Sequence, residues 1–258
     1  MNVYCVQFDS VWNDKEKNFK SITSILNKHS IEEKSLIVLP EMFATGFSLN
    51  PSLTTLNEPD KTELFLSELA LEKNSWVIGG MCQKSEVKNM AYNTAVTFNP
   101  HGERISIYKK IHPIPILNET KYHLPGQTIE SIKIDSFQVT PAICYDLRFP
   151  EIFRLGVKSG AFLFVVLGCW PKNRIDHWAS LLKARAIENQ AYVIGVNRIG
   201  KDLDLEYGGR SMVISPSGEI LCDAGEKQMV LESIITFELV QKWRAEFPVI
   251  KEFLKEVT

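Results

Sequence analysis

The stretch VTPAICYDLRFPE, residues 139–151, joins an apolar strand-like run to a polar turn through a single cysteine, Cys144. A cysteine at the end of a buried strand most often packs in the core as a small apolar side chain. Open α/β folds, however, gather their catalytic groups at the carboxyl ends of strands. Cys144 is therefore a candidate for either role, and the residues around it in the fold have to decide between them.

Length and composition indicate an ordinary soluble globular protein. The chain has 258 residues, of which 45% are hydrophobic and 23% charged. No linker, repeat or compositional break divides it, so we expect one α/β domain over residues 1–258. The net charge of −2 provides no basic surface for nucleic acid or for an anionic membrane.

The compartment is predicted from the apolar runs and the cysteines. No run reaches the roughly 20 apolar residues that cross a bilayer, and the first residues lack the pattern of a secretory signal. The five cysteines, at positions 5, 82, 144, 169 and 222, are odd in number and form no CxxC pair. This favours reduced thiols in a cytoplasmic protein over a disulfide framework or a structural zinc site.

Strand-like runs alternate with helix-like segments along the chain. The strand-like runs are VYCVQF, SLIVLP, WVIGG, AYNTAVTFNP, ERISIYKK, SFQVTPAIC, AFLFVVLGC, AYVIGVN and SMVISPSGEIL. Helices are predicted over 14–28, 60–73, 150–158, 174–189 and 238–248, and hairpin turns at 100–102 and 216–218. Because both crossover helices and hairpins connect the strands, the sheets should be mixed.

Two charged residues also follow strand-like runs. Glu41 comes directly after SLIVLP, beside Met42 and Phe43, and Lys110 closes ERISIYKK. Taken singly, they are most simply explained as a solvated loop glutamate and a solvated strand-edge lysine. Placed with Cys144 at one edge of the fold, they would supply a base, a nucleophile, and an ammonium that favours the thiolate and holds an oxyanion.

The segments LPEMF, YKKIH and CYDLRFPE, in that order, resemble the three signature segments of the nitrilase superfamily of carbon–nitrogen hydrolases. RAIENQAYVIGVN and SMVISPSGEIL are similar to its later segments, so the resemblance covers nearly the whole chain. It implies a single carbon–nitrogen hydrolase domain, folded as a four-layer αββα sandwich with two mixed β-sheets, and a homodimer. It also implies a catalytic triad of Glu41, Lys110 and Cys144, supported by Glu119.

The chemistry that this resemblance implies is acyl transfer through a cysteine thioester. Cys144 would attack the amide carbon of a small-molecule substrate while Glu41 moves the proton. Lys110 and the backbone N–H of Tyr145 would stabilise the oxyanion, and Glu119 would orient Lys110 or the substrate amide. No step requires a metal or an organic cofactor.

Other hydrolase classes find less support. The five histidines show no HExxH spacing of a zinc hydrolase. A papain-like partner for Cys144 would have to be His112 or His177, and neither lies in a motif of that kind. A protein that binds ligands on this scaffold with a vestigial site is the alternative outside catalysis.

Two details near the signature segments bear on how the site is built. Members of the superfamily often have leucine and phenylalanine after the histidine of the lysine segment, whereas here His112 is followed by Pro113 and Ile114. Asp146 and Arg148, just past the nucleophile, could form an ion pair at the turn or contact the substrate. The sequence favours neither role.

The segment CWPKNRIDHW, residues 169–178, indicates the substrate class. Its W-P-x-x-R-x-x-H-W pattern resembles the bacterial omega-amidase branch, which removes the terminal amide of 2-oxo dicarboxylic acid monoamides such as 2-oxoglutaramate and 2-oxosuccinamate. An amidase for deaminated glutathione and an N-carbamoyl hydrolase are the alternatives within the superfamily. Trp170 is expected to form a pocket wall, and Arg148 and Arg174 are candidates to hold the substrate carboxylate in a bidentate contact.

Overall fold

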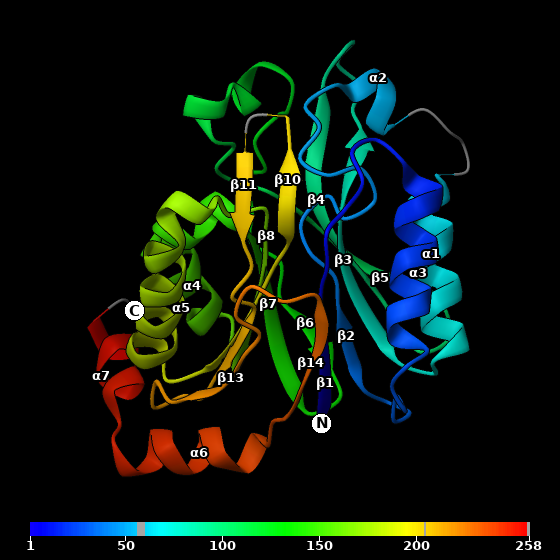
Figure 1. Ribbon diagram of the computed structural model, residues 1–258. Helices are drawn as coiled ribbons and strands as arrows, with labels where there is room; N and C mark the ends of the chain where they lie inside the picture. Colours follow the sequence, from blue (N-terminus) through cyan, green and yellow to red (C-terminus); the bar gives the residue numbers. More distant parts are fainter. Residues whose placement is uncertain (56–59, 204, 257–258) are drawn as a thin grey trace.

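A computed structural model describes residues 1–55, 60–203 and 205–256, and its secondary structure is arranged in four layers (Figure 1). Two six-stranded sheets pack face to face in the middle. Helices α1 (Lys15–Leu26) and α3 (Lys61–Glu72) cover the outer face of one sheet, and α4 (Pro150–Lys158) and α5 (Ile175–Asn189) cover the other. The predicted αββα sandwich is confirmed.

The first sheet has the strand order β14-β1-β2-β3-β4-β5. Its strands are β1 (Asn2–Gln7), β2 (Leu36–Val38), β3 (Trp76–Lys84), β4 (Ala91–Phe98), β5 (Arg104–Lys109) and β14 (Met229–Ile234). The pairs β1–β2 and β2–β3 are parallel, and the others are antiparallel. β14 returns from late in the chain to pair with β1, so the two halves of the sequence share one sheet.

The second sheet has the order β13-β12-β9-β8-β7-β6. Its strands are β6 (Ile132–Ile134), β7 (Phe137–Ile143), β8 (Leu163–Gly168), β9 (Tyr192–Asn197), β12 (Met212–Ile214) and β13 (Ile220–Asp223). The three central strands, β7, β8 and β9, are parallel and are connected by α4 and α5. The strands at both edges pair antiparallel. A separate hairpin pairs β10 (Ile199–Asp202) with β11 (Leu205–Gly208).

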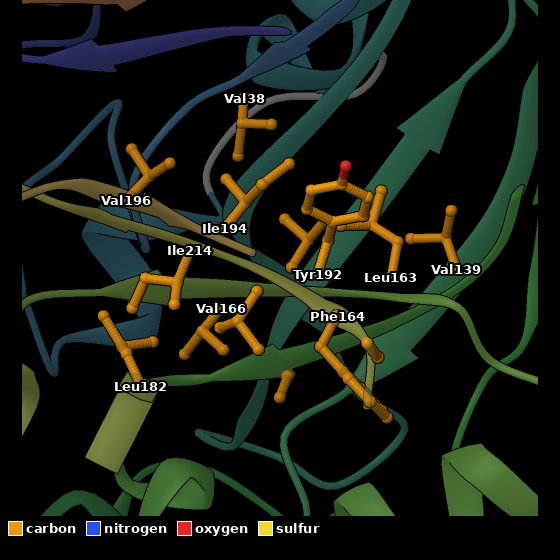
Figure 2. Packing of buried hydrophobic residues seen from close by; sticks show 14 of the residues in the cluster. Val38, Val139, Leu163, Phe164, Val166, Leu182, Tyr192, Ile194, Val196 and Ile214 are labelled. Atoms are coloured by element: carbon orange, nitrogen blue, oxygen red, sulfur yellow. The ribbon is translucent and has the colours of Figure 1, made fainter. Parts of the chain in front are cut away.

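The core follows from the alternation of side chains along the strands. Figure 2 shows Ile194 and Val196 of β9 on the side of the sheet that faces Val38 of the first sheet. Val166 of β8 lies on the opposite side with Leu182 of α5. Both faces of the second sheet are therefore buried, which explains why its central strands read as nearly continuous apolar runs.

The predicted helices at 14–28, 60–73, 150–158 and 174–189 are confirmed by α1, α3, α4 and α5. The sequence did not indicate β6, β14 or the β10–β11 hairpin. The helix predicted over 238–248 is confirmed by α6 (Phe237–Glu246), which ends before Pro248, but the sequence did not indicate the second helix, α7 (Val249–Glu256), beyond that proline. Within the described residues, no helix has both the length and the apolar character that crossing a bilayer requires.

Candidate active site

The turns after β2 and β5 bring Glu41 and Lys110 into direct contact, and a short helical turn adds Glu119. Lys110 Nζ lies 2.9 Å from Glu41 Oε1 and 2.9 Å from Glu119 Oε2. All three side chains are fully buried, with an exposed fraction of 0%. The solvated roles that each charge would most simply have are therefore excluded by their burial.

The charges of this cluster stabilise one another. Burial alone would lower the pKa of Lys110, but the neighbouring carboxylates of Glu119 and Glu41 outweigh it and hold that pKa well above its ordinary value. Burial would likewise raise the pKa of Glu119, yet the ammonium of Lys110 and hydrogen bonds to the carboxylate leave that pKa lowered. Lys110 is thus a cation and Glu119 an anion in the folded protein.

Cys144 begins a tight turn after β7. Its φ is +47°, in the left-handed region that a side chain rarely adopts, and it starts the 3-10 helix η3 (Cys144–Arg148). The N–H of Tyr145, second in this helix, has no acceptor within it, since a 3-10 bond spans three residues. The turn therefore places a thiol beside a backbone donor.

The surroundings of Cys144 disfavour its thiolate. Burial, followed by the nearby charge of Glu41, raises its pKa well above the ordinary value, and the opposing influence of Lys110 is too small to reverse this. Lys110 by itself favours the thiolate, as expected from the sequence, but the carboxylates of Glu41 and Glu119 oppose it. A nucleophilic role for Cys144 then requires that a base remove its proton during attack.

Glu41 is held by donors on both oxygens. Its Oε1 accepts hydrogen bonds from Lys110 Nζ at 2.9 Å and from Asn93 Nδ2 at 2.7 Å. Its Oε2 accepts the backbone N–H of Cys169 at 2.7 Å. Neither Asn93 nor the N–H of Cys169 was identified from the sequence, although the alternation in AYNTAVTF puts Asn93 on the same face as the inward-pointing Ala95.

The loop that departs from the superfamily pattern supports Glu119. Glu119 begins the 3-10 turn η2 (Glu119–Lys121), and its Oε2 accepts the backbone N–H of Ile114 at 2.6 Å. The N–H of Glu119 in turn donates to the carbonyl of Ile114 at 3.1 Å. Pro113 has no N–H to offer, so Ile114 is the residue of that pair that can bind the carboxylate.

Asp146 links the turn of Cys144 to the segment that follows Lys110. It is fully buried, and its Oδ2 accepts from Tyr108 Oη at 2.7 Å and from the N–H of Ile143 at 3.0 Å. Its Oδ1 accepts the N–H of His112 at 2.9 Å. These partners take the place of the ion pair with Arg148 that the sequence left open, and they give Asp146 a structural role.

Arg148 lies over the face of Trp170. Its guanidinium carbon is 4.6 Å from the Trp170 ring centroid and 5.9 Å from that of Tyr145. Trp170 itself is only 2% exposed, and its Nε1 donates to the carbonyl of Arg174 at 2.7 Å. Trp170 is thus a core residue of which one face supports Arg148, and Arg174 is fixed beside it through its backbone.

An apolar cluster adjoins the charged groups. It consists of Met42, Phe47, Cys82, Ile114, Cys169 and Tyr207, with Leu49, Leu117, Tyr145 and Leu205 packed against it. The ring of Phe47 lies 5.6 Å from Lys110 Nζ. Low polarity on this side strengthens the electrostatic interactions of the cluster. In the part of the chain that the structure describes, no group of three His, Cys, Asp or Glu side chains is placed to hold a metal ion.

The chain is similar to known proteins in both sequence and fold. The carbon-nitrogen hydrolase family model matches residues 2–245. A Staphylococcus aureus protein described as a hydrolase in the agr operon is 36% identical over 97% of this chain and 97% of its own. A 2-oxoglutaramate amidase of Paenarthrobacter nicotinovorans is 34% identical over 96% of this chain and 86% of its own. A CN-hydrolase superfamily protein of Xanthomonas campestris, 27% identical, matches with a TM-score of 0.91 over 98% of this chain and 96% of its own.

Proposed function

The chain belongs to the carbon-nitrogen hydrolase family and is an enzyme that hydrolyses amide C–N bonds. We propose that its substrate is a short 2-oxo dicarboxylic acid monoamide, from which it removes the terminal amide through a thioester on Cys144. The observation that supports the chemistry is the buried contact of Lys110 with Glu41 and Glu119, beside a thiol on a strained turn. The substrate class rests on Arg148 and on the relative that is a 2-oxoglutaramate amidase.

In the first half of the reaction, Glu41 takes the thiol proton as Cys144 Sγ attacks the amide carbon. The negative charge passes to the carbonyl oxygen, where the ammonium of Lys110 and the N–H of Tyr145 stabilise it. Glu41 then returns the proton to the leaving nitrogen as the C–N bond breaks, so that ammonia departs rather than an amide anion.

In the second half, water attacks the thioester while Glu41 takes one of its protons. The tetrahedral intermediate collapses to the free acid, and the thiol of Cys144 is regenerated with that proton. Glu119 fixes the ammonium throughout, because it accepts Lys110 Nζ with both oxygens, at 3.1 and 2.9 Å.

Arg148 is the arginine that we assign to the substrate carboxylate. Arg148 lies four residues beyond Cys144 in the same 3-10 helix, which corresponds to about 8 Å along the helix axis. A substrate that contacts both residues is therefore a short molecule. The guanidinium of Arg148 lies over the ring of Trp170, and its two terminal nitrogens face His177 Nδ1 at 3.4 and 3.5 Å. A substrate carboxylate would take the place of His177 and accept two charge-assisted hydrogen bonds. The apolar cluster suits the methylene groups between the two ends of the substrate.

A panel of amides tests the substrate. Ammonia release should be much faster from 2-oxoglutaramate or 2-oxosuccinamate than from an uncharged aliphatic amide of similar length. Faster turnover of deaminated glutathione or of an N-carbamoyl amino acid would contradict the proposed substrate class and assign the enzyme to another branch of the superfamily. The proposed amidase chemistry would still hold.

The nucleophile is tested by Cys144→Ala, which should abolish ammonia release and leave the melting temperature nearly unchanged. Intact-mass analysis with a slow substrate should detect an acyl group on Cys144. Cys222→Ala is the matched control, since Cys222 lies on β13 at an edge of the second sheet, whereas the thiol of Cys169 donates to the carbonyl of Glu41 at 3.2 Å. An acyl group on Cys169, or full activity of Cys144→Ala, would refute the assignment.

A further inference from the structure

We infer that Asn93 is a positioning residue of this site, whose side-chain amide holds Glu41 and Glu119 together as carboxylates and so keeps Glu41 competent to take the proton of Cys144. The inference rests on the role proposed for Glu41. It is carried by the hydrogen bonds of one nitrogen atom and by the burial of the oxygen beside it.

A single nitrogen of Asn93 bridges the two glutamates. Nδ2 donates to Glu41 Oε1 at 2.7 Å and to Glu119 Oε1 at 2.8 Å. A planar NH2 group has two hydrogens that point in different directions, so it can satisfy two acceptors at once. The amide is uncharged, and it therefore stabilises both carboxylates without competing with the ammonium of Lys110.

The other end of the amide fixes its orientation. Oδ1 of Asn93 is buried and has no hydrogen-bond partner among the residues that the structure describes. Turning the amide over would put this oxygen against two carboxylate oxygens, which is repulsive. An unpaired buried carbonyl destabilises a protein, and the two hydrogen bonds from Nδ2 to the carboxylates offset that cost.

The backbone of Asn93 also reaches the site. Its carbonyl accepts the N–H of Lys110 at 2.8 Å, where the chain leaves β5. Asn93 pairs on its other side with Cys82 of β3, inside the sheet. One rigid residue in the middle of a strand thus touches Glu41, Lys110 and Glu119.

The titratable groups around Asn93 define what a pH profile would report. Besides Glu41, Lys110, Glu119 and Cys144, the neighbouring groups are Cys169, Cys82 and His123. Burial lowers the pKa of His123 to about 4 and raises that of Cys82 to about 12, so neither changes its charge between pH 5 and 9. A change of the pH profile between pH 5 and 9 therefore reports the titration of the Glu41 and Glu119 carboxylates and of the Cys144 thiol.

The sharpest test is Asn93→Asp, which keeps the shape of the side chain and replaces the shared donor by a third carboxyl group. Loss of a hydrogen bond to a charged group should raise the pKa of the carboxylate pair, and the acid limb of kcat/KM should move up by about one to two pH units. Asn93→Ala removes the donor without adding a charge, and its acid limb should move up by about one unit. It answers the same question if the aspartate variant does not fold.

Alkylation of Cys144 gives a readout that needs no substrate. Iodoacetamide labelling of Cys144, located by peptide mass, should be about tenfold slower in Asn93→Asp than in wild type at pH 7.5. The third carboxylate adds negative charge that raises the pKa of the thiol, as Glu41 and Glu119 already do, and each pKa unit lowers the thiolate fraction tenfold. Asn189→Asp is the matched control: its Nδ2 also donates twice, at 2.9 and 3.4 Å, and its Oδ1 is also buried without a partner in the described chain. Asn189 lies at the end of α5, so the Asn189→Asp variant should show the same acid limb of kcat/KM and the same labelling rate of Cys144 as wild type.

The outcomes separate this inference from the function on which it rests. Folded Asn93 variants with a wild-type acid limb and a wild-type labelling rate would overturn the positioning role, whatever their melting temperatures. A wild-type protein that releases no ammonia from any amide, or an active Cys144→Ala variant, would instead overturn the proposed function. In that case the labelling comparison would still decide whether Asn93 controls the protonation of Cys144.

Discussion

Replacing Lys110 by methionine should reverse the way in which the stability of the protein depends on pH. Lys110 is the ammonium between Glu41 and Glu119, and all three side chains are fully buried. Removing one partner of a buried ion pair costs about 3–5 kcal/mol, because it leaves buried charge without compensation. At about 2–4 °C per kcal/mol for a chain of this size, Lys110→Met should melt roughly 10 °C below wild type at pH 8.

The sign of the pH dependence follows from the pKa shifts. In wild type the pKa of Glu119 is lowered, so its contribution is present above the unfolded value of about 4.3 and is lost as the pH falls through the folded value. Without the ammonium, burial and mutual repulsion raise the pKa of the carboxylate pair above the unfolded value. The variant should then regain stability relative to wild type as the pH falls from 8 to 5, by up to about 1.4 kcal/mol for each unit by which the pKa is raised.

Urea unfolding of both proteins at pH 5 and pH 8 measures this difference. Lys172→Met is the matched control, because Lys172 also lies between two glutamates, Glu206 and Glu226, at 3.4 and 2.9 Å, but on the surface. Its melting temperature should change little at either pH. A loss of stability in Lys110→Met that is equal at the two pH values would refute the reasoning, since it would mean that the buried carboxylates do not titrate with the loss of the lysine.

Two further predictions concern turnover. Glu41→Gln should lower kcat by about 10²–10⁴-fold in steady-state ammonia release, because the amide cannot accept the proton of Cys144, and a near-normal kcat would mean that another group is the base. Arg148→Leu should raise KM for 2-oxoglutaramate and leave kcat within about threefold, since the carboxylate is bound alike in the ground and transition states. The control is Arg154→Leu on α4, which removes a guanidinium 4.7 Å from the ring centroid of Phe253 on α7 and should leave KM unchanged. An equal effect of both substitutions would argue against a specific contact of Arg148.

The sequence was sufficient where structure depends on neighbours along the chain. The spacing of apolar residues placed α1, α3, α4 and α5 within a few residues of their observed bounds, because a helix is defined by contacts three and four residues apart. Glu41, Lys110 and Cys144 could be selected because each lies at the end of a strand-like run, and the structure brings Glu41 and Lys110 into contact.

The sequence was insufficient where a residue depends on a distant partner. β14 is a strand because it pairs with β1, more than 200 residues earlier, and β6 is only three residues long. Asn93 is an ordinary strand residue in its own segment, and its importance comes from Glu41 and Glu119, which lie on two other loops. The pKa of the Cys144 thiol could not be predicted for the same reason, since burial and Glu41 raise it while Lys110 lowers it.

The two sheets together explain how a neutral thiol and a charged base can react without a large rearrangement. Glu41 and Lys110 follow strands of the first sheet, Cys144 follows a strand of the second, and Asp146 joins them through Tyr108 and His112. In the proposed reaction, the proton moves from Cys144 to Glu41 and the negative charge moves to the substrate oxygen, so the total charge facing Lys110 is unchanged. The ammonium, held in place by Glu119, then exchanges one anionic partner for another. Preorganisation of this kind avoids the cost of reorienting solvent during attack, and it requires that the donors around Glu41 be fixed before the substrate binds.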